Sequence, residues 1–450
     1  MARAFSLSGF PEWLPAERIV EESVLRAAQR IFALHGFAAI ETRAVEPLER
    51  LAGSSDASKE VYGLRRVHGD GNALDLGLHF DLTVPFARYV AENAGLLDFP
   101  FRRSQIQKVW RGERPQEGRF REFTQADIDI VDRDRLAFHH DVEMALVMAN
   151  VLAELPIPRA VIHVSNRKLA EGFYRGLGIT DVAATLRTVD KLDKIGPERV
   201  QEALVETTGI TPAAARACLA LAAIRSGDAG FEAAVRALGV SHDLLDEGIA
   251  ELAEVVEGCN VERPGSVVAD LRIARGLDYY TGTVYETDLP DIPGIGSIAS
   301  GGRYDQLARV GSTTYPGVGM SLGVTRLVWV LLNVVGLRAT RSVPSVVLIA
   351  VLDEGARPRS AAVASALRAR GIPCEVASSA EKFGKQIRMA DRRGIPFVWF
   401  PSTEEGQADS VKDIRSGRQA PADAAHWSPP GADWWPRVVT ADDDVEDQTP

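Results

Sequence analysis

Hydrophobic and polar residues alternate along the chain with two different periods, which separate helical from extended segments. Apolar side chains recur at steps of three and four from Pro15 to Gly36, so a helix ended by the glycine is expected there. A second helix is expected over 136–155, where Ala, Leu and Val recur with helical spacing. Short extended segments are predicted over the following ranges: 37–45, 62–68, 74–84, 105–111 and 120–131.

Two antiparallel hairpins are expected among these segments. Residues 68–72 have turn composition and residues 112–118 have loop composition, so the segments on either side of each are expected to pair. In the strand after the second loop, Gln125, Asp127 and Asp129 fall on one face, because side chains of a strand alternate with a period of two. That face is acidic and carries an amide.

The second half of the chain changes pattern twice. Residues 181–257 are rich in Ala, Leu and Glu with Gly and Pro between short segments, which predicts an inserted helical domain. Extended segments at 267–273, 283–287 and 298–304 and an apolar helix at 323–335 follow. After Arg341, strands and helices alternate, which predicts a small parallel or mixed α/β domain with these elements: 345–352, 357–370, 374–377, 380–393 and 397–400.

Composition narrows the class of protein. The 450 residues, 46% hydrophobic and 25% charged, allow about three domains with a large core. Three widely spaced cysteines provide neither a disulfide framework nor a CxxC metal site, so a reducing, cytoplasmic setting is expected. The longest apolar run, 346–352, is too short to span a bilayer, and the N-terminus lacks the apolar core of a signal peptide, so no membrane association is expected.

Charge and motif searches exclude several kinds of chemistry. A net charge of −11 argues against generic polyanion binding, although it does not exclude a local basic site. The eight histidines are scattered and none neighbours a cysteine, so no metal-ligating set is predicted, and no serine lies in a GxSxG motif. The glycine-rich segment 317–326 lacks the Lys-Ser/Thr of a P-loop and the spacing of a dinucleotide fingerprint, which argues against a Rossmann-type dehydrogenase.

Three groups of residues could carry chemistry. Residues 101–122 contain seven Arg or Lys and three Glu, a difference of +4, and their arginines suit a phosphate group, although a solvated charged hairpin explains the charges equally well. Residues 275–286 could hold a small polar aromatic molecule beside an anion, or could be a charged hairpin with core tyrosines. Arg326 could reach an anion from the side opposite Arg111, or could form a surface salt bridge.

Together these segments resemble the histidyl-tRNA synthetases of the class II family, over nearly the whole chain. Residues 37–46 resemble the first class motif, and residues 80–89 (FDLTVPFARY) resemble the amino-acid-binding segment. The second and third class motifs match residues 111–125 and 317–327. The two histidine-specific signatures match residues 275–286 and 300–305 (SGGRYD).

The resemblance implies an α/β (α+β) fold with an antiparallel sheet flanked by helices, a helical insertion and a C-terminal α/β anticodon-binding domain. It also implies a homodimer whose substrates are L-histidine, ATP with Mg²⁺, and tRNA(His). The expected domain boundaries are 1–180 and 259–340 for the two parts of the catalytic domain, 181–258 for the insertion, 341–432 for the anticodon-binding domain and 433–450 for an acidic, disordered tail.

The resemblance also implies roles for individual residues. Arg111 and Arg275 would bracket the α-phosphate and the histidine carboxylate, Arg119 and Arg326 would hold pyrophosphate, and Glu113 would hydrogen-bond adenine. The α-ammonium group would bind Asp81, Thr83 and Gln125, and the imidazole would bind Asp129 and Tyr280. Leu82 and Tyr279 complete the expected histidine-binding set.

The sequence departs from the family pattern in places. Arg43 stands where a proline is expected in the first motif, and Asp81 and Asp129 are one methylene shorter than the glutamates of some relatives. The alternative is a non-catalytic, synthetase-like regulatory subunit that binds histidine in histidine biosynthesis. Such subunits typically lack the anticodon-binding domain and the catalytic arginine, whereas this chain has both Arg275 and the 343–400 segment.

Overall fold

The computed structural model describes residues 7–51, 60–67, 75–273, 279–404 and 406–440. The chain divides into two compact units, the first formed by Met1–Pro11 and Val24–Val330 and the second by Glu12–Ser23 and Leu331–Pro450. The first helix, α1 (Pro15–Leu34), matches the predicted helix closely. Among the described residues, no helix is both long enough and apolar enough to cross a membrane.

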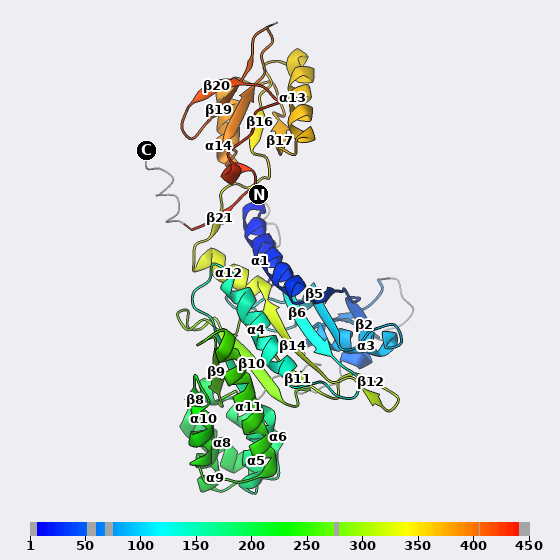
Figure 1. Ribbon diagram of the computed structural model, residues 1–450, viewed down its shortest axis with the longest axis vertical. Coiled ribbons are helices and arrows are strands. Elements are labelled where there is room, and N and C mark those ends of the chain that lie inside the picture. The colour runs from blue at the N-terminus through cyan, green and yellow to red at the C-terminus, as the bar shows by residue number, and fades with distance from the viewer. Residues whose placement is uncertain (1–6, 52–59, 68–74, 274–278, 405, 441–450) are drawn as a thin grey trace. The chain divides into compact units, whose positions relative to one another are not determined.

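A mixed sheet dominates the first unit (Figure 1). Nine strands of the described residues form it in the order β1-β5-β6-β14-β11-β10-β7-β9-β8, and all neighbours are antiparallel except the pairs β1 with β5 and β7 with β9. This confirms the expected sheet. The strand bounds are β1 Ala38–Ala39, β5 Phe101–Trp110, β6 Glu122–Val131, β7 Val161–Asn166, β8 Arg225–Ser226, β9 Val267–Asp270, β10 Thr283–Asp288, β11 Ala299–Tyr304 and β14 Gly317–Gly323.

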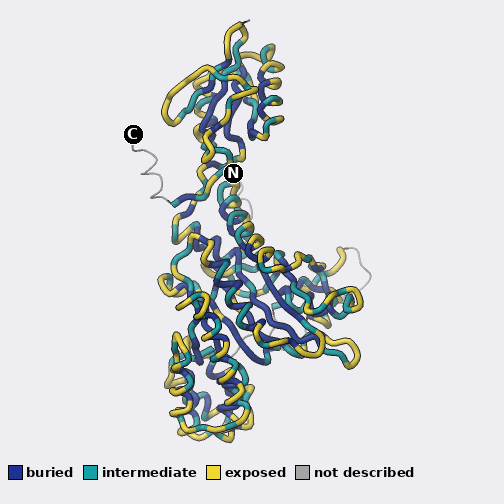
Figure 2. Tube along the Cα trace, in the orientation of Figure 1, coloured by how far each residue is buried: buried dark blue, intermediate teal, exposed yellow. Residues whose placement is uncertain are grey.

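Two long helices, α4 (His139–Ala153) and α11 (Asp243–Glu262), pack against this sheet. Most of the central strand residues are buried, as the dark trace in Figure 2 shows. Helix α11 also crosses α5 (Arg167–Gly176) at very close range, because a Cβ on Gly248 would lie 2.2 Å from the backbone nitrogen of Leu169. Glycine is therefore required where these two helices meet.

The segment between β7 and β9 is largely helical, as the sequence predicts for 181–257. Its helices after α5 are short and amphipathic, with Val200, Leu204 and Phe231 fully buried or nearly so. Their bounds are α6 Val182–Val189, α7 Leu192–Ile195, α8 Pro197–Thr208, α9 Pro212–Ala222 and α10 Gly230–Arg236.

The region before β5 departs from the predicted strands. The segment expected over 74–84 ends early, because β4 (Leu76–Leu78) is followed by helix α3 (Thr83–Asn93). The physical reason is local: Asp81 Oδ1 accepts a hydrogen bond at 3.1 Å from the backbone nitrogen of Val84, which satisfies one free N–H of the first helical turn. The predicted turn at 68–72 lies outside the described residues.

Three small elements complete this region and two further short pairs lie elsewhere in the chain. The strand expected over 37–45 is shorter in the structure, where only β1 is extended. A separate three-stranded sheet has the order β2-β4-β3. The remaining bounds are β2 Val45–Pro47, α2 Leu48–Leu51, β3 Gly63–Leu64, β12 Arg309–Val310, β13 Thr313–Thr314, β15 Arg338–Ala339 and β21 Val438–Val439.

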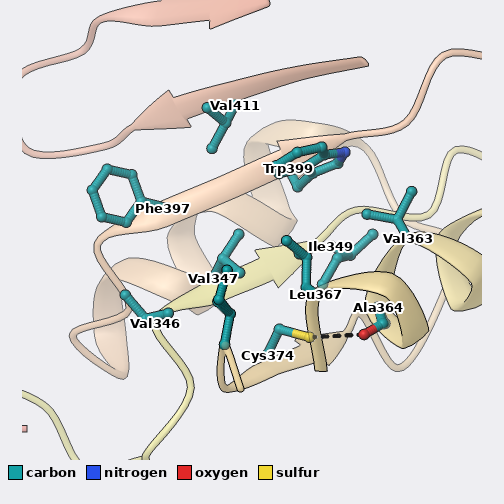
Figure 3. Packing of buried hydrophobic residues seen from close by; sticks show 11 residues of the cluster. Val346, Val347, Ile349, Val363, Ala364, Leu367, Cys374, Phe397, Trp399 and Val411 are labelled. Atoms are coloured by element: carbon teal, nitrogen blue, oxygen red, sulfur yellow. Dashed lines mark hydrogen bonds between the residues drawn. The ribbon is translucent and has the colours of Figure 1, made fainter. Parts of the chain in front are cut away.

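The second unit contains the predicted α/β domain, a five-stranded sheet of the described residues in the order β17-β16-β18-β19-β20. Strand β16 is parallel to both neighbours, whereas β19 and β20, which the sequence pattern did not predict, add antiparallel strands. Figure 3 shows its core, where the dashed line marks the hydrogen bond from Cys374 Sγ to the carbonyl oxygen of Ala364 at 3.5 Å. The fully buried Trp399 also donates through Nε1 to Asp409 Oδ2 at 3.0 Å. The bounds are β16 Val347–Ile349, α13 Arg357–Ala369, β17 Cys374–Val376, α14 Phe383–Arg392, β18 Phe397–Phe400, β19 Asp409–Asp413 and β20 Gln419–Ala422.

Candidate active site

A cavity of about 570 Å³, called the main cavity below, opens on one face of the nine-stranded sheet. Its walls come from the loop between β5 and β6, from β6, β10, β11 and β14, and from Arg326 in helix α12 (Val324–Asn333). Five of the predicted site residues line it directly: Arg111, Glu113, Arg119, Gln125 and Arg326. Tyr280 lines both this cavity and a smaller one, called the inner cavity, which also contains Thr83, Asp127 and Asp129.

Three arginines bring positive charge to the main cavity. Arg111 donates through Nε to the carbonyl oxygen of Phe80 at 2.9 Å, and its guanidinium lies 5.1 Å from the centre of the Phe123 ring. Arg326 donates through Nε to the carbonyl oxygen of Gly118 at 3.0 Å and through a terminal nitrogen to that of Ser297. These contacts fix both guanidinium groups at the cavity wall, where each can still donate to an anionic ligand.

The positive charges of these three arginines repel one another. Burial lowers the pKa of Arg326, and the positive charges of Arg119 and Arg111 lower it further. A bound anion would relieve this repulsion, so the cluster has the electrostatic character of a phosphate site.

Arg119 is paired within the described structure. It forms an ion pair with Glu113, and although burial alone would raise the pKa of Glu113, the contact with Arg119 lowers it overall. A ligand that binds both Arg119 and Glu113 must therefore either break this ion pair or bind to both side chains while they stay paired.

The inner cavity is built around an ion cluster that the sequence did not single out. The fully buried Arg103 of β5 lies 2.6 Å from Asp129 Oδ2 and 3.8 Å from Asp127 Oδ2, and its guanidinium stacks over the ring of Phe86 at 4.5 Å. Asp129 Oδ1 accepts a hydrogen bond at 2.7 Å from the hydroxyl of Tyr304. Asp129 is thus partnered on both oxygens.

Two acceptors on the same face of β6 are not partnered. Gln125 Oε1 and Asp127 Oδ1 are buried and have no hydrogen-bond partner among the residues that the structure describes. Gln125 donates through Nε2 to Ser321 Oγ at 2.6 Å, which fixes the direction of its oxygen. Burial raises the pKa of Asp127 to about 7 and that of Asp129 to about 6, although Arg103 opposes both shifts. Buried acceptors of this kind suit a ligand that carries N–H donors.

The remaining predicted histidine-binding residues lie close to this cluster but do not all line a cavity. Asp81 is buried and accepts at 3.2 Å from the hydroxyl of Tyr279, which in turn packs edge-on against Tyr280. Burial raises the pKa of Asp81. Leu82 is a fully buried core residue, and its backbone oxygen rather than its side chain faces Arg103, at 3.5 Å. Arg275 lies outside the described residues.

Sequence reasoning missed Arg103, Tyr304 and Ser321, although a signal for them was present. In the ladder between β5 and β6, Arg103 pairs with Asp129, Gln105 with Asp127, and Gln107 with Gln125. The polar alternation from 103 to 107 therefore mirrors the alternation from 125 to 129, and matching the two strands could have identified Arg103.

Gly319 leaves room for Asp129, and we expect a side chain there to destabilise the site. A Cβ at this position would lie 2.1 Å from Asp129 Oδ1 and 2.7 Å from the backbone oxygen of Ile128. Gly319→Ala should therefore lower the free energy of unfolding by about 1–3 kcal/mol, as overpacking typically does. Urea unfolding measures this loss, with Gly95→Ala as the control because its Cβ would meet nothing within 4 Å. Equal stabilities of the two variants would contradict the crowding.

Comparison with known proteins gives consistent results over both units. The family described as histidyl-tRNA synthetase matches residues 9–327, and the family described as an anticodon binding domain matches residues 345–419. The Cutibacterium acnes protein named histidine-tRNA ligase is 58% identical over 451 residues, covering 98% of this chain and 99% of that protein. The Micrococcus luteus protein of the same name is 56% identical over 458 residues, covering 98% and 100%. The crystal structure of histidyl-tRNA synthetase from Nostoc sp. PCC 7120 matches with a TM-score of 0.81 and 32% identity, covering 100% of both chains.

Proposed function

The chain belongs to the histidyl-tRNA synthetase family, and on that premise we propose that it attaches L-histidine to tRNA(His) in an ATP-dependent reaction through histidyl-adenylate. The feature of the site that supports this function most directly is its division into two parts. Arginines line the main cavity, whereas unpartnered acceptors on β6 point toward a ligand with N–H donors. ATP supplies the anion, and histidine supplies an ammonium group and a ring N–H.

The first step is attack by the histidine carboxylate on the α-phosphorus of ATP. A bond forms between a carboxylate oxygen and that phosphorus, and the bond to the bridging oxygen breaks, so pyrophosphate leaves with its electron pair. We assign Arg111, together with Arg275, to the charge that develops around the α-phosphate and the carboxylate. Phosphoryl transfer of this kind is accelerated mainly by positioning and electrostatic stabilisation.

Other residues of the main cavity would bind the triphosphate end and the adenine end of ATP. Arg119 and Arg326 would hold the departing pyrophosphate, and Glu113 would hydrogen-bond the adenine amino group. In this scheme ATP binding separates the ion pair of Arg119 with Glu113, so that each side chain exchanges its partner for a part of the nucleotide. Mg²⁺ would arrive with ATP, as a hard cation bound mainly to the phosphate oxygens.

Histidine would occupy the inner part of the site. Asp81, Thr83 and the free oxygen of Gln125 would accept from its α-ammonium group, with Leu82 holding the backbone beside them. Tyr279 orients Asp81 through the hydrogen bond described above, and Tyr280 and Asp129 would bind the imidazole. In the second step the terminal ribose hydroxyl of tRNA attacks the carbonyl carbon, and AMP leaves.

The rest of the chain would serve tRNA binding and assembly. We propose that the domain matched at 345–419 contacts the anticodon of tRNA(His) and that the protein works as a cytoplasmic homodimer. The regulatory-subunit alternative is not favoured, because close relatives over the full chain are named histidine-tRNA ligases.

Pyrophosphate exchange tests the proposed function directly. Purified protein should incorporate labelled pyrophosphate into ATP when L-histidine is present, because adenylate formation is reversible, and should not do so with the other amino acids. Subsequent transfer of labelled histidine to tRNA(His) completes the test. Histidine binding without exchange would instead support a regulatory protein.

A further inference from the structure

The chain continues beyond the part that matches the anticodon-binding family and returns to the stretch that leads into the α/β domain. The family match ends at residue 419, whereas the described structure extends to Thr440. Strand β21 pairs antiparallel with β15, which lies between the end of α12 and the first strand of the α/β domain. Residues 334–346 are called the linker below, and residues 431–440 are called the C-terminal segment.

Backbone hydrogen bonds hold the middle of the linker to the C-terminal segment. The backbone nitrogen of Thr340 donates to the carbonyl oxygen of Arg437 at 2.8 Å, and the backbone nitrogen of Arg437 donates to Thr340 Oγ1 at 3.0 Å. Just before β15, the buried Leu337 donates through its backbone nitrogen to the carbonyl oxygen of Leu331 in α12 at 2.8 Å. The linker is therefore tied to other parts of the chain on both sides of β15.

The side chain of Arg341 joins the same two segments. It is 4% exposed and donates to four carbonyl oxygens, two in the linker and two in the C-terminal segment. The acceptors are Val343 and Pro344, each at 3.1 Å, Asp433 at 2.8 Å and Trp434 at 2.9 Å. Burial lowers the pKa of Arg341 to about 10, so the guanidinium stays charged at neutral pH. Hydrogen bonds from a charged donor are stronger than those between neutral groups, which favours this closed arrangement.

The C-terminal segment is in turn attached to the α/β domain. Both carboxylate oxygens of Asp433 accept from terminal nitrogens of Arg415, each at 2.9 Å. Trp434 packs against the hydrophobic core that Figure 3 shows. A bidentate pair fixes direction as well as distance, so the segment has a rigid base on the domain.

We infer that residues 431–440 form a strap that holds the linker to the α/β domain and thereby supports the charging of tRNA. The inference rests on the proposed function, in which one tRNA molecule contacts the α/β domain through its anticodon and the main cavity through its terminal ribose. A short, ordered linker raises the effective concentration of the second contact once the first has formed, whereas a longer free linker lowers it. Adenylate formation is assigned to residues of the first unit, so it should not depend on the strap.

Limited proteolysis with trypsin tests whether the strap holds the linker, independently of the reaction that the protein catalyses. Arg338 and Arg341 provide cleavage sites in the linker, and cleavage requires a locally opened backbone. A chain that ends at Pro430 should be cut there about 10-fold faster than a chain that ends at Thr440, as measured by mass spectrometry of the fragments. Both chains lack residues 441–450, so only the strap distinguishes them. Equal rates would overturn the inference.

Asp433→Ala tests the same point in a chain of full length, because it weakens the base of the strap and leaves Trp434 in place. Cleavage in the linker should become about 3- to 10-fold faster, since the open form is more populated. Gly431→Ala is the control, because its Cβ would meet nothing within 4 Å, and it should leave the rate unchanged. Asp433→Ala decides the question if the shorter chain does not fold, and an unchanged rate would then count against the strap.

Kinetics show whether the strap serves the charging step. In Asp433→Ala the KM for tRNA(His) in histidine transfer should rise by about 3- to 10-fold. The kcat of pyrophosphate exchange and the KM values for histidine and ATP should stay within about twofold of the wild-type values. An unchanged KM for tRNA(His), or an equal loss in exchange and transfer, would refute the role in charging. Absence of exchange in the wild-type protein would instead refute the proposed function, while the proteolysis result would still decide whether the strap holds the linker.

Discussion

Arg111→Ala is expected to lower kcat for histidine-dependent pyrophosphate exchange by about 10²- to 10³-fold, the usual loss when one preorganised donor to a developing anion is removed. Arg111 is held from two sides, by its hydrogen bond to Phe80 and by the Phe123 ring. Its terminal nitrogens therefore lie in the main cavity before the substrates bind, and little reorganisation is needed in the transition state.

Two companion variants show whether charge or geometry is responsible. Arg111→Lys keeps the charge but loses the planar fork, so most of the activity should still be lost. Arg114→Ala removes an exposed arginine from the same loop and should leave kcat unchanged. Full activity of Arg111→Ala with normal histidine and ATP KM values would remove Arg111 from the proposed mechanism.

The sheet was predictable because its strands have clear alternation and its loops have clear composition. The pairing of 105–111 with 120–131 is confirmed by β5 and β6, and the face with Gln125, Asp127 and Asp129 borders the two cavities. The start of α3 was not predictable from periodicity, because residues 74–84 are apolar enough for a strand. The helix begins there because Asp81 caps its first turn, a single contact that a periodic pattern does not contain.

The positive charge of residues 101–122 was harder to interpret from sequence. In the structure Lys108 pairs with Glu122, and Arg102 pairs with Glu143 across the fold. Lys108 therefore belongs to a charged hairpin, and Arg102 joins that hairpin to helix α4. Arg111 and Arg119 instead line the main cavity. The charged-hairpin explanation thus holds for Lys108 and Arg102, whereas a phosphate-binding role for Arg111 and Arg119 stays a prediction. Net charge could not separate them, because it carries no information on which side of the strand each side chain lies.

Arg103→Met is expected to cause the largest loss of stability, about 3–5 kcal/mol at neutral pH, because it leaves Asp127 and Asp129 buried without a counter-charge. Arg103 is completely buried and also donates to Gln105 Oε1 at 3.1 Å. Arg102→Met serves as the control, since the neighbouring Arg102 is partly exposed and should matter much less. Urea unfolding of the two variants measures the difference.

The pH dependence of this loss distinguishes charge from packing. The pKa values of Asp127 and Asp129, about 7 and about 6, lie above the ordinary value of 3.8, so the native state binds these protons more tightly than the unfolded chain does. The stability they contribute is therefore present below a pH of about 4 and is lost as the pH rises through 6 to 7. Without Arg103 both carboxyl groups should hold their protons to still higher pH, and the deficit of Arg103→Met should be larger at pH 8 than at pH 5.

A second substitution separates the two causes further. In Arg103→Met combined with Asp129→Asn, the cation and its nearest carboxylate are removed together, so part of the lost stability should return. A deficit that is the same at both pH values and is not relieved by Asp129→Asn would mean that Arg103 acts through its packing on Phe86. The expected pH dependence would mean that β6 keeps two acidic groups that weaken the fold near neutral pH. A binding face needs acceptor groups for the N–H donors of a substrate, and keeping such groups buried lowers the stability of the fold.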